Sequence, residues 1–467
     1  MRTPCHLALL LVAAACGNVV EKQKNTCDTA ADCTDPASPY CVNGACQAAC
    51  AVNTDCKDPA RDVCASDGMC VGCVMNSDCD ATAPVCDTGE RACRGCERDS
   101  ECPGGVCVEA DGTCVADAQV AFVTMMGTDS GTCTRAAPCA TIPFAISNAG
   151  ARQVIHVLGG SLATPSLVFT ADRILDGEDT TLSAGGQTTI AVGSSAKLTV
   201  EGFRVTAPTM GMPPAPAITG GNGTRLRLWG MTISGDGGTA VNASGGDLTL
   251  SHSHIGSLSL QNPMHVFCPN AKALIDQNTL EMTIVGDNGT QCELTVSRNR
   301  FESSRDGSVQ LSSGLLVMEN NLIIHRDGFN DSISLGNLRA GSVVRFNSVV
   351  NTTAVASDGA ALSCNSGVVV TSNIFAYNSG HPITGTCETR YSVFDTVAVT
   401  SSGTGNQTVN IDQIFANRGA GDYHLAASSV AKGNAEPGLT MVKVDFEGKA
   451  RPNPAGSMAD SGAFEAP

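Results

Sequence analysis

Apolar and polar residues alternate in a phrase that returns at regular intervals between residues 198 and 375. Each copy has an apolar residue, two variable ones, a polar one, one more, and a second apolar residue; the polar place holds Ser253, Asn278, Asn299, Asn320, Asn347 and Asn373. These positions lie 25, 21, 21, 27 and 26 residues apart, and weaker upstream copies have Phe203 and Met231 there. Such alternation is typical of strands. A repeat of about 24 residues predicts that each copy forms one coil of a parallel β-solenoid.

The asparagine at the bend of each predicted coil has a physical role. Asn tolerates the left-handed backbone region better than most residues do. Asn side chains stacked at the strand spacing of about 4.8 Å can also hydrogen-bond from coil to coil. Only 4% of the residues are aromatic, which suits a narrow core of Val, Ile and Leu. The alternative is a β-sandwich with irregular strands.

Two cysteine pairs offer an independent test of this repeat. Cys268 and Cys292 are 24 residues apart, and Cys364 and Cys387 are 23 apart. Equivalent residues on neighbouring coils lie roughly 5 Å apart, within the Cα separation of a disulfide. We therefore expect the disulfides Cys268–Cys292 and Cys364–Cys387 to join neighbouring coils.

The first residues have the pattern of a secretory signal. Met1-Arg2 precedes an apolar run that is too short to span a bilayer. The run ends in Ala13-Ala-Ala-Cys16-Gly17, which looks like a bacterial lipobox except that Ala13 stands where Leu is usual. The resemblance implies cleavage before Cys16 and a lipid on Cys16. Residues 1–15 are then the signal peptide, and residues 16–26 are a lipid-anchored linker.

The expected location follows from the same residues. Asp is absent after Cys16, which resembles lipoproteins that are sorted to an outer membrane. We expect an outer-membrane protein that is surface-exposed or faces the periplasm, with the lipid as its only membrane contact. The alternative is an ordinary Ala-x-Ala cleavage, after which Cys16 carries no lipid and the protein is secreted.

Residues 27–114 carry 16 of the 24 cysteines, in four units at residues 27–46, 50–70, 73–93 and 96–114. The first cysteines of successive units are 23 residues apart, and an Asp or Glu precedes every second cysteine. Units this small cannot form an apolar core, and even cysteine counts behind a secretory signal favour disulfides. Zinc is the alternative, but zinc sites favour Cys-x2-4-Cys pairs. Here the gaps within a unit are mostly five to seven, and the segment has no His.

Four cysteines in a unit allow three pairings. We favour bonds from the first cysteine to the third and from the second to the fourth, which are Cys27–Cys41, Cys33–Cys46, Cys50–Cys64, Cys56–Cys70, Cys73–Cys86, Cys79–Cys93, Cys96–Cys107 and Cys102–Cys114.

The spacing of these units resembles the Dickkopf-like, or Asp-Cys, cysteine-rich repeats found in tandem on lipoproteins of myxobacteria and their relatives. Residues 27–114 hold 16 Asp or Glu and 5 Lys or Arg, a net charge of −11 out of −17 for the chain. Such a segment repels nucleic acid, so we exclude DNA and RNA as partners. We expect a solvated, disulfide-closed stalk. No cofactor is expected, with calcium between the Asp-rich loops left open.

A new segment begins after the last stalk cysteine. For residues 117–150 we expect a first strand at Val120–Thr124, a loop closed by a Cys133–Cys139 disulfide, and a short helix at Ala140–Gly150. Thr141 suits the N-cap position of this helix. A helix here can cover the open apolar end of a solenoid, which would otherwise invite end-to-end association.

Residues at both ends of the predicted solenoid carry a family resemblance. Gly131–Thr141 and Val154–Gly160 look like the opening of bacterial pectate-lyase-like right-handed β-helix proteins, and Asp422–Leu425 and Asp460–Glu465 are similar to the closing segment of secreted β-helix proteins. The resemblance implies an all-β fold: a right-handed parallel β-helix of about ten coils at residues 151–420 and a C-terminal closing segment at residues 421–467. This fold hosts lyases, hydrolases, adhesins and binding proteins alike, so it implies no activity.

Catalytic signatures of that family are missing from the coils. Its lyases use acidic calcium ligands and an arginine base, and its hydrolases use clustered Asp, His-Gly and Arg-x-Lys; the coils have no paired-Asp motif, no Arg-x-Lys and no His-Gly. His252 and His254 alternate on one predicted strand face and are expected to face solvent. No third ligand accompanies them, so no metal site is predicted.

One local set of residues forms a candidate ligand surface. Arg305-Asp306-Gly and Arg326-Asp327-Gly start 21 residues apart and should stack on adjacent coils, with His325 alongside. Arg suits carboxylates and paired Asp suits calcium, so the hypothesis is a shallow site for an acidic sugar or a calcium ion. The alternative is two equivalent surface turns, since Asp-Gly is a common turn signal.

The sequence favours a monomeric cell-surface lipoprotein whose β-helix binds extracellular polysaccharide or another cell surface without catalysis. A polysaccharide lyase or glycoside hydrolase with an unrecognised site is the first alternative, and a clustered Arg/Asp groove on one face would favour it. A purely structural spacer is the second. Whether the chain is an enzyme stays open, with the balance against it.

Overall fold

The computed structural model describes residues 27, 32–34, 40–42, 44–47, 50–208, 214–235, 238–257, 264–268, 271–286, 292–303, 307–325, 330–352, 359–365, 367–376, 382–395 and 403–466. The chain divides into two units, Met1–Cys114 and Val115–Pro467. The predicted signal peptide, Cys16 and the linker lie outside the described residues. Within the described ranges, no helix has the length and apolar character needed to cross a membrane.

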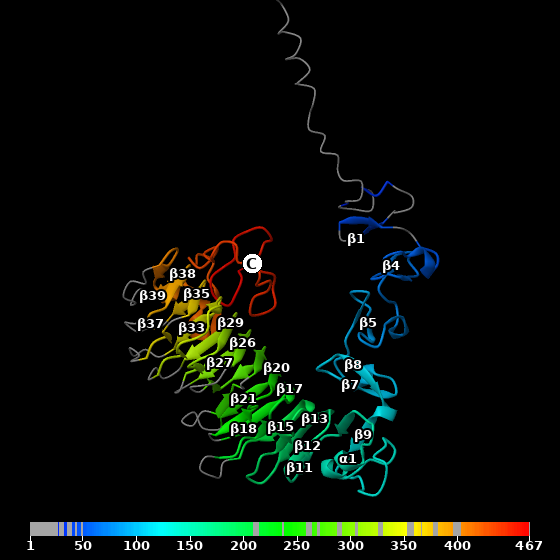
Figure 1. The fold of residues 1–467 in the computed structure, drawn as a ribbon. Coiled ribbons are helices and arrows are strands. Elements are labelled where there is room, and N and C mark those ends of the chain that lie inside the picture. The colour runs from blue at the N-terminus through cyan, green and yellow to red at the C-terminus, as the bar shows by residue number, and fades with distance from the viewer. Residues whose placement is uncertain are drawn as a thin grey trace, which may run out of the picture. The chain divides into compact units, whose positions relative to one another are not determined.

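The second unit consists of parallel strands in three sheets that stack coil upon coil (Figure 1). The first sheet contains β9 (Val120–Val123), β10 (Val154–Val157), β13 (Arg173–Ser183), β15 (Lys197–Thr206), β17 (Arg225–Trp229), β20 (Asp247–Ser251), β23 (Lys272–Asp276), β26 (Glu293–Ser297), β29 (Leu315–Glu319), β32 (Ser342–Arg345), β35 (Val368–Thr371) and β38 (Glu388–Arg390). The second contains β11 (Ser161–Ala163), the later halves of β13 and β15, β18 (Thr232–Gly235), β21 (His254–Ser257), β24 (Thr279–Leu280), β27 (Arg300–Ser303), β30 (Leu322–His325), β33 (Ser348–Asn351), β36 (Ile374–Ala376), β39 (Val393–Asp395) and β40 (Gln407–Val409). The third, of ten strands, contains β12 (Leu167–Phe169), β14 (Ile190–Val192), β16 (Ile218–Gly220), β19 (Thr239–Asn242), β22 (Met264–Phe267), β25 (Met282–Gly286), β28 (Val309–Leu311), β31 (Ile333–Leu335), β34 (Leu362–Cys364) and β37 (Ile383–Gly385).

Alternating side chains make the coils stack. In β26, Leu294 and Val296 point into the central core, while the residues between them are partly exposed. One coil further on, Leu316 and Met318 occupy the same places in β29. Burying one such side chain fully contributes about 1.5–3 kcal/mol, so stacking stabilises each coil on the next. The predicted parallel β-solenoid is confirmed, and the β-sandwich alternative is wrong.

A column of buried asparagines marks the bend between the first and second sheets. It contains Asn278, Asn299, Asn321, Asn347 and Asn373. The prediction of Asn320 at this place is therefore wrong by one residue. The repeat fits this coil in two registers, because the apolar Val317-Met318, the Asn pair and the apolar Leu322-Ile323 are all doublets.

Each asparagine of this column bonds to the next. Nδ2 of Asn299 donates to Oδ1 of Asn321 at 3.1 Å, and the backbone N–H of Asn299 donates to the same oxygen at 2.9 Å. The predicted coil-to-coil hydrogen bonds are confirmed. The left-handed residue, however, is the one before each column residue, such as Arg298 (φ 53°) and Phe346 (φ 55°). The prediction that the column residues themselves adopt this conformation is wrong, and their role is hydrogen bonding.

A short helix covers the first coil. α1 (Ile142–Asn148) begins after Thr141, whose Oγ1 accepts a hydrogen bond from the backbone N–H of Phe144 at 3.3 Å. Ile142 and Ala145 are buried in the central core, and the helix contacts β9, β10 and β12. The predicted capping helix is therefore confirmed.

Three disulfides lie in this unit. Cys133–Cys139 closes the loop before α1, with a Cα separation of 4.8 Å. Cys268–Cys292 and Cys364–Cys387 join neighbouring coils, with Cα separations of 5.9 and 5.7 Å. All three disulfides were predicted from the sequence. The 24- and 23-residue spacings of the two coil-to-coil pairs therefore equal the length of one coil at those places.

The C-terminal segment packs on the side of the last coils. It contains the 3₁₀ helices η6 (Ile411–Gln413) and η7 (Arg418–Ala420) and the antiparallel strands β41 (Phe415–Asn417) and β42 (Asp422–Leu425). Outward-facing residues of β30, β33, β36 and β39 are buried with residues of this segment, in a cluster that includes Leu322, Val350, Ile374, Val393, Phe415, Tyr423 and Phe464. These strands are therefore buried on both faces.

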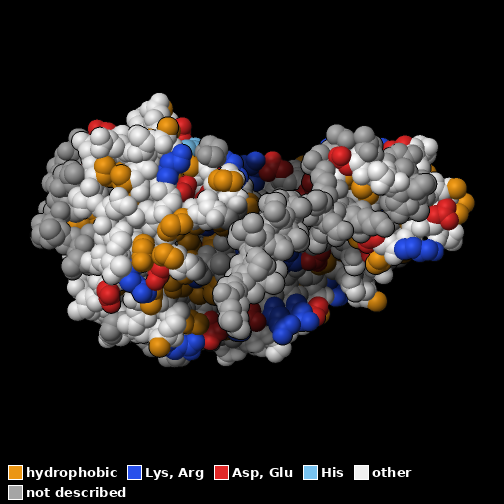
Figure 2. All heavy atoms as spheres, turned by 90° about the horizontal axis from the view of Figure 1, so that it is seen from above, with side chains coloured by type: hydrophobic (Ala, Val, Ile, Leu, Met, Phe, Trp, Pro, Cys, Tyr) orange, Lys and Arg blue, Asp and Glu red, His pale blue; other side chains and the backbone are white. Residues whose placement is uncertain are grey.

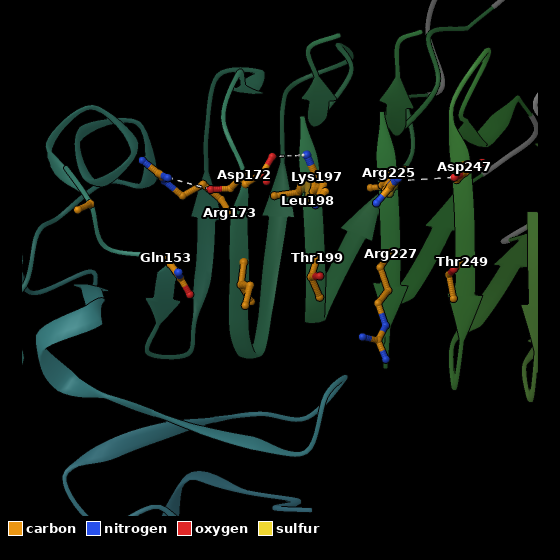
Figure 3. A pocket seen from close by; sticks show the side chains of 13 residues that line it. Gln153, Asp172, Arg173, Lys197, Leu198, Thr199, Arg225, Arg227, Asp247 and Thr249 are labelled. Atoms are coloured by element: carbon orange, nitrogen blue, oxygen red, sulfur yellow. Dashed lines mark hydrogen bonds and ion pairs between the residues drawn. The ribbon is translucent and has the colours of Figure 1, made fainter. Parts of the chain in front are cut away.

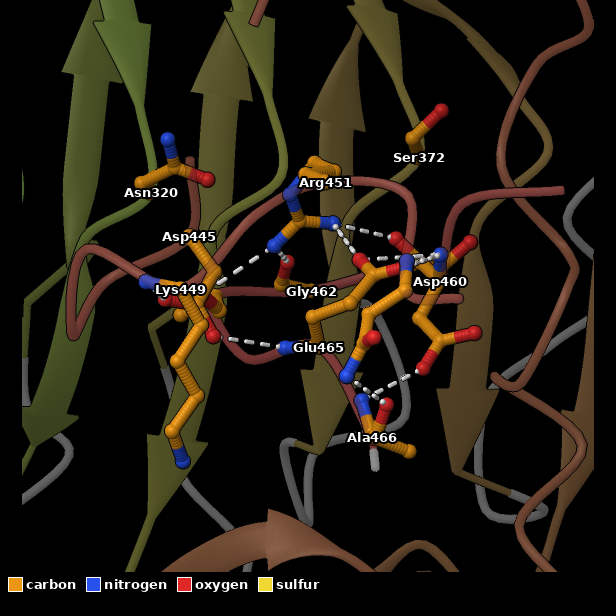
Figure 4. Close-up of polar contacts among 12 residues, drawn as sticks. Asn320, Ser372, Asp445, Lys449, Arg451, Asp460, Gly462, Glu465 and Ala466 are labelled. Carbon is orange, nitrogen blue, oxygen red and sulfur yellow. Dashed lines mark hydrogen bonds and ion pairs between the residues drawn. The ribbon is translucent and has the colours of Figure 1, made fainter. Parts of the chain in front are cut away.

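A buried ion pair organises this segment (Figure 4). Arg451 and Glu465 have side chains that are 1% and 0% exposed and lie 3.0 Å apart. The Arg451 guanidinium also donates to the backbone oxygen of Asp460 and lies 4.3 Å from the centre of the Phe346 ring. Asn320 Nδ2 donates to the backbone oxygen of Val444 at 2.9 Å, which ties the segment to the bend.

The first unit is a row of small hairpins, each held by two disulfides. It contains β1 (Tyr40–Val42), β2 (Ala45–Gln47), β3 (Val63–Cys64), β4 (Cys70–Val71), β5 (Val85–Asp87), β6 (Ala92–Arg94), β7 (Gly105–Val108), β8 (Thr113–Ala116) and the 3₁₀ helices η2 (Asn53–Asp55), η3 (Asn76–Asp78) and η4 (Asp99–Glu101), and η5 (Asp117–Gln119) follows it. The eight disulfides join the first cysteine to the third and the second to the fourth in each repeat, with Cα separations of 5.3–5.9 Å. No thiolate is left among them for the zinc alternative.

The acid before every second cysteine has a structural role. Oδ2 of Asp55 accepts hydrogen bonds from the backbone N–H groups of Ala51 and Val52, and Oδ2 of Asp78 accepts two equivalent bonds in the next repeat. These backbone donors hold the pKa of Asp55 below its usual value. The Asp of each Asp-Cys pair therefore stabilises a turn of the backbone.

Candidate functional site

A groove crosses the outward face of the first sheet (Figure 3). Its volume is about 840 Å³, and it extends over β13, β15, β17 and β20. The lining residues are Ala151, Gln153, Asp172, Arg173, Ile174, Lys197, Leu198, Thr199, Arg225, Leu226, Arg227, Asp247 and Thr249.

The strand alternation that forms the core also points charged residues into the groove. In β17, Leu226 and Leu228 face the core, so Arg225 and Arg227 face outward. Lys197 and Asp247 flank Arg225 on the neighbouring strands. Figure 3 shows these side chains in one row across the strands, with Thr199, Arg227 and Thr249 in a second row. Outward positions on successive coils thus form one continuous surface.

The groove is basic although the chain is acidic. Four cationic side chains line it (Arg173, Lys197, Arg225 and Arg227) against two carboxylates (Asp172 and Asp247), a net of +2, whereas the chain has a net charge of −17. The Arg225 and Asp247 side chains are 67% and 50% exposed and 4.0 Å apart, so their attraction is weak. On the face shown in Figure 2, Lys and Arg lie in small groups among Asp and Glu. The groove therefore carries a local excess of cations.

The two carboxylates of the groove are not arranged for hydrolysis. Oδ1 of Asp172 accepts a hydrogen bond from the backbone N–H of Lys197 at 2.9 Å, and Oδ1 of Asp247 accepts one from Lys272 at 3.2 Å. Asp172 precedes β13 and Asp247 begins β20, with β15 and β17 between them. Three strand spacings separate them by roughly 14 Å, whereas paired glycosidase carboxylates lie about 5–9.5 Å apart.

A second groove of about 440 Å³ continues from the first over β23, β26 and β29. Asp247 and Thr249 line both grooves. Its lining combines the apolar Leu274 and Val317 with the charged Lys272 and Glu293. Together the two grooves give the first sheet a long open trough that suits an extended chain.

The residues that the sequence named as a ligand surface are only partly described. Arg305, Asp306, Arg326 and Asp327 lie outside the described residues, so that hypothesis stays a prediction. His325, at the end of β30, is 0% exposed, and burial lowers its pKa to about 4. A buried neutral imidazole does not contribute to a shallow surface site.

The two other histidines discussed from the sequence both face solvent, as expected. They do not share a strand: His252 occupies the bend after β20 with φ 55°, and His254 begins β21. The prediction that they alternate on one strand face is wrong, because the bend falls between them.

The groove itself was missed by sequence reasoning. Its six charged residues come from four coils, and each coil contributes only one or two of them. The available signal was the run Arg225-Leu-Arg-Leu-Trp229, which places three large polar or aromatic side chains on one face of a strand.

No family model and no curated protein matches the chain. Solved structures that match it include a PL6 family alginate lyase, AlyGC (11% identity, TM-score 0.30, over 62% of this chain and 57% of the lyase). The pectate lyase Pel9A matches at 10% identity and TM-score 0.34 over 74% of this chain and 96% of its own. Pectin methylesterase PemA from Erwinia chrysanthemi matches at 14% identity and TM-score 0.27 over 66% of this chain and 98% of its own. At these scores the similarity carries no argument about activity, and the β-solenoid fold rests on the strand pairings above.

Proposed function

We propose that this chain displays its β-helix to bind an acidic extracellular polysaccharide along the first sheet, without cleaving it. The observation that carries the proposal is the net positive groove on a strongly acidic chain. Arg and Lys bind carboxylates through charge-assisted hydrogen bonds. An open trough along the coils accommodates a polymer better than a compact metabolite.

The N-terminal features complete this proposal. A lipid on Cys16 would anchor the chain to an outer membrane, and the disulfide-closed repeats would serve as a spacer. The net charge of −11 on residues 27–114 discourages the spacer from binding the same acidic polymer. Binding would then be confined to the groove.

A lyase or hydrolase is the second candidate, and the presence of Arg and Asp in one groove favours it. The separation of Asp172 and Asp247 argues against a two-carboxylate hydrolase. The enzyme hypothesis to test is therefore a lyase in which one arginine of the groove acts as the base.

The test uses the purified full chain on immobilised polygalacturonate, alginate and dextran, with and without calcium, over a series of NaCl concentrations. Retention on the acidic polymers that falls with salt, without release of unsaturated or reducing ends, is expected. Release of either kind of end would make the protein an enzyme. Absence of retention on every polymer would leave the spacer function.

A double variant tests the groove directly. Lys197→Gln with Arg225→Gln removes two exposed cations that each contribute up to about 1 kcal/mol, so affinity should fall by up to roughly 30-fold. Arg204→Gln is the matched control, because it removes a cation from the same strand as Lys197 but outside the groove, where Arg204 pairs with Asp179. Equal losses in the control and the double variant would count against the groove.

A further inference from the structure

An aromatic pair lies beside the basic groove. Trp229 is the single tryptophan of the chain and ends β17. Its indole packs against the imidazole of His252, with ring centres 3.9 Å apart and an angle of 33° between the rings. Trp229 is partly exposed and His252 is exposed, so the pair borders solvent.

The pair adjoins the groove through Arg227. Trp229 and Arg227 are two residues apart in β17, so both side chains leave the sheet on its outward face about 6.6 Å apart. The Arg227 guanidinium carbon lies 5.7 Å from the centre of the Trp229 ring, and Arg227 lines the groove. An aromatic surface and a cation therefore stand side by side at the border of the groove.

Coil formation does not require an aromatic residue at this place. The residues in register with Trp229 on neighbouring and later coils of the first sheet are Glu201, Ser251, Asp276, Ser297 and Glu319. All of these are small or acidic, and their coils stack in the same way. Packing of the solenoid therefore does not explain why this position holds a tryptophan.

The backbone holds His252 in position. It adopts φ 55° at the bend, and the next residue, Ser253, is buried and donates its backbone N–H to Oδ1 of Asn278 at 2.8 Å. The imidazole is also packed against the indole of Trp229, so a ligand that binds the pair orders little more of the His252 side chain. The aromatic pair is preorganised.

We propose that Trp229 and His252 form a stacking subsite for one sugar ring of the bound polysaccharide, and that Arg227 binds the carboxylate of that ring. Pyranose rings present apolar C–H faces that pack against flat aromatic side chains, and a neighbouring guanidinium selects the rings that carry a carboxylate. The inference rests on the proposed function and narrows its ligand to a polymer of uronic acids.

The single tryptophan makes the test direct. Titration of the full chain with a galacturonate oligomer should change the tryptophan emission in a saturable way, because the only indole lies in the subsite. His252→Ala keeps the fluorophore and should weaken binding by about tenfold. His254→Ala is the matched control, because His254 is also exposed but belongs to β21 of the second sheet, and it should bind like the wild type.

The tryptophan variants are measured by calorimetry. Trp229→Phe keeps a flat ring, so it should lose less binding affinity for the oligomer than Trp229→Ala.

Failure of this inference is distinct from failure of the proposed function. If the oligomer binds and Lys197→Gln with Arg225→Gln weakens it, but emission is unchanged and His252→Ala binds like the wild type, the groove stands and the stacking subsite is refuted. An equal emission change with a neutral dextran oligomer would refute the carboxylate role of Arg227. If no uronate oligomer or polymer binds at all, the proposed function fails, and the subsite fails with it.

Discussion

Replacing Asn321 by Ala should destabilise the β-helix far more than replacing its neighbour Asn320 by Gly. Asn321 is 0% exposed, and its Oδ1 accepts two hydrogen bonds from Asn299. The two hydrogens of its Nδ2 are shared among three acceptors, which are two backbone oxygens and Oδ1 of Asn347. Its partners on the neighbouring coils, Asn299 and Asn347, are equally buried. Alanine removes these hydrogen bonds, four in total, and leaves buried backbone groups without partners.

The expected magnitudes follow from these bonds. Each contributes about 1 kcal/mol net, so Asn321→Ala should lower the free energy of unfolding by about 4 kcal/mol. Asn320 makes one hydrogen bond, from Nδ2 to the backbone oxygen of Val444, and has φ 55°. Glycine adopts that φ freely, so Asn320→Gly should cost only about 1 kcal/mol.

Urea unfolding of the non-reduced full chain, followed by far-ultraviolet circular dichroism, measures both losses. The two variants replace the same type of side chain at adjacent positions, so the comparison isolates the hydrogen bonds that each asparagine makes. Equal losses, or a larger loss for Asn320→Gly, would show that the asparagine column does not stabilise the coils as its geometry indicates.

Three further predictions concern other parts of the chain. Replacing Cys268 and Cys292 by Ser opens a 24-residue loop and should lower the free energy of unfolding by about 3 kcal/mol; an unchanged urea midpoint would contradict the coil-to-coil bond. Burial holds the pKa of His325 at about 4 against 6.5 in the unfolded chain, so its contribution to stability is complete above pH 6.5 and is lost as the pH falls towards 4. The stability difference between wild type and His325→Gln should therefore shrink by about 3 kcal/mol over that range, and a pH-independent difference would rule this out. Cys16→Ser should abolish incorporation of a labelled fatty acid and partitioning into detergent, and persistent partitioning would exclude the lipid anchor.

Local chemistry in the sequence was sufficient for the coil architecture. A disulfide needs a short Cα separation, so the spacing of Cys268 and Cys292 reports the coil length without any knowledge of the fold. Thr141 starts a helix because its hydroxyl accepts a backbone N–H, which is a contact within one turn. Features of this kind are readable because the interacting residues are near in sequence or repeat at a fixed interval.

Features that depend on which residues of neighbouring coils pair could not be predicted in the same way. Asn320 and Asn321 fit the repeat equally well, and only the hydrogen bonds of neighbouring coils distinguish them. The groove has the same difficulty, because Lys197 and Arg225 become neighbours only when the strand pairing is known. The lateral packing of the C-terminal segment depends on contacts between residues more than 100 positions apart, such as the hydrogen bond from Asn320 to Val444.

The disulfides of the first unit have a consequence for how such proteins diversify. Each of the eight bonds joins two cysteines of the same repeat, and none links one repeat to the next. A gene duplication or deletion of one whole repeat therefore adds or removes a closed module without leaving an unpaired thiol or disturbing oxidative folding elsewhere. With the proposed lipid on Cys16, the number of repeats would set the length of chain between the anchor and the β-helix, and selection could adjust it in steps of one repeat without changing the groove.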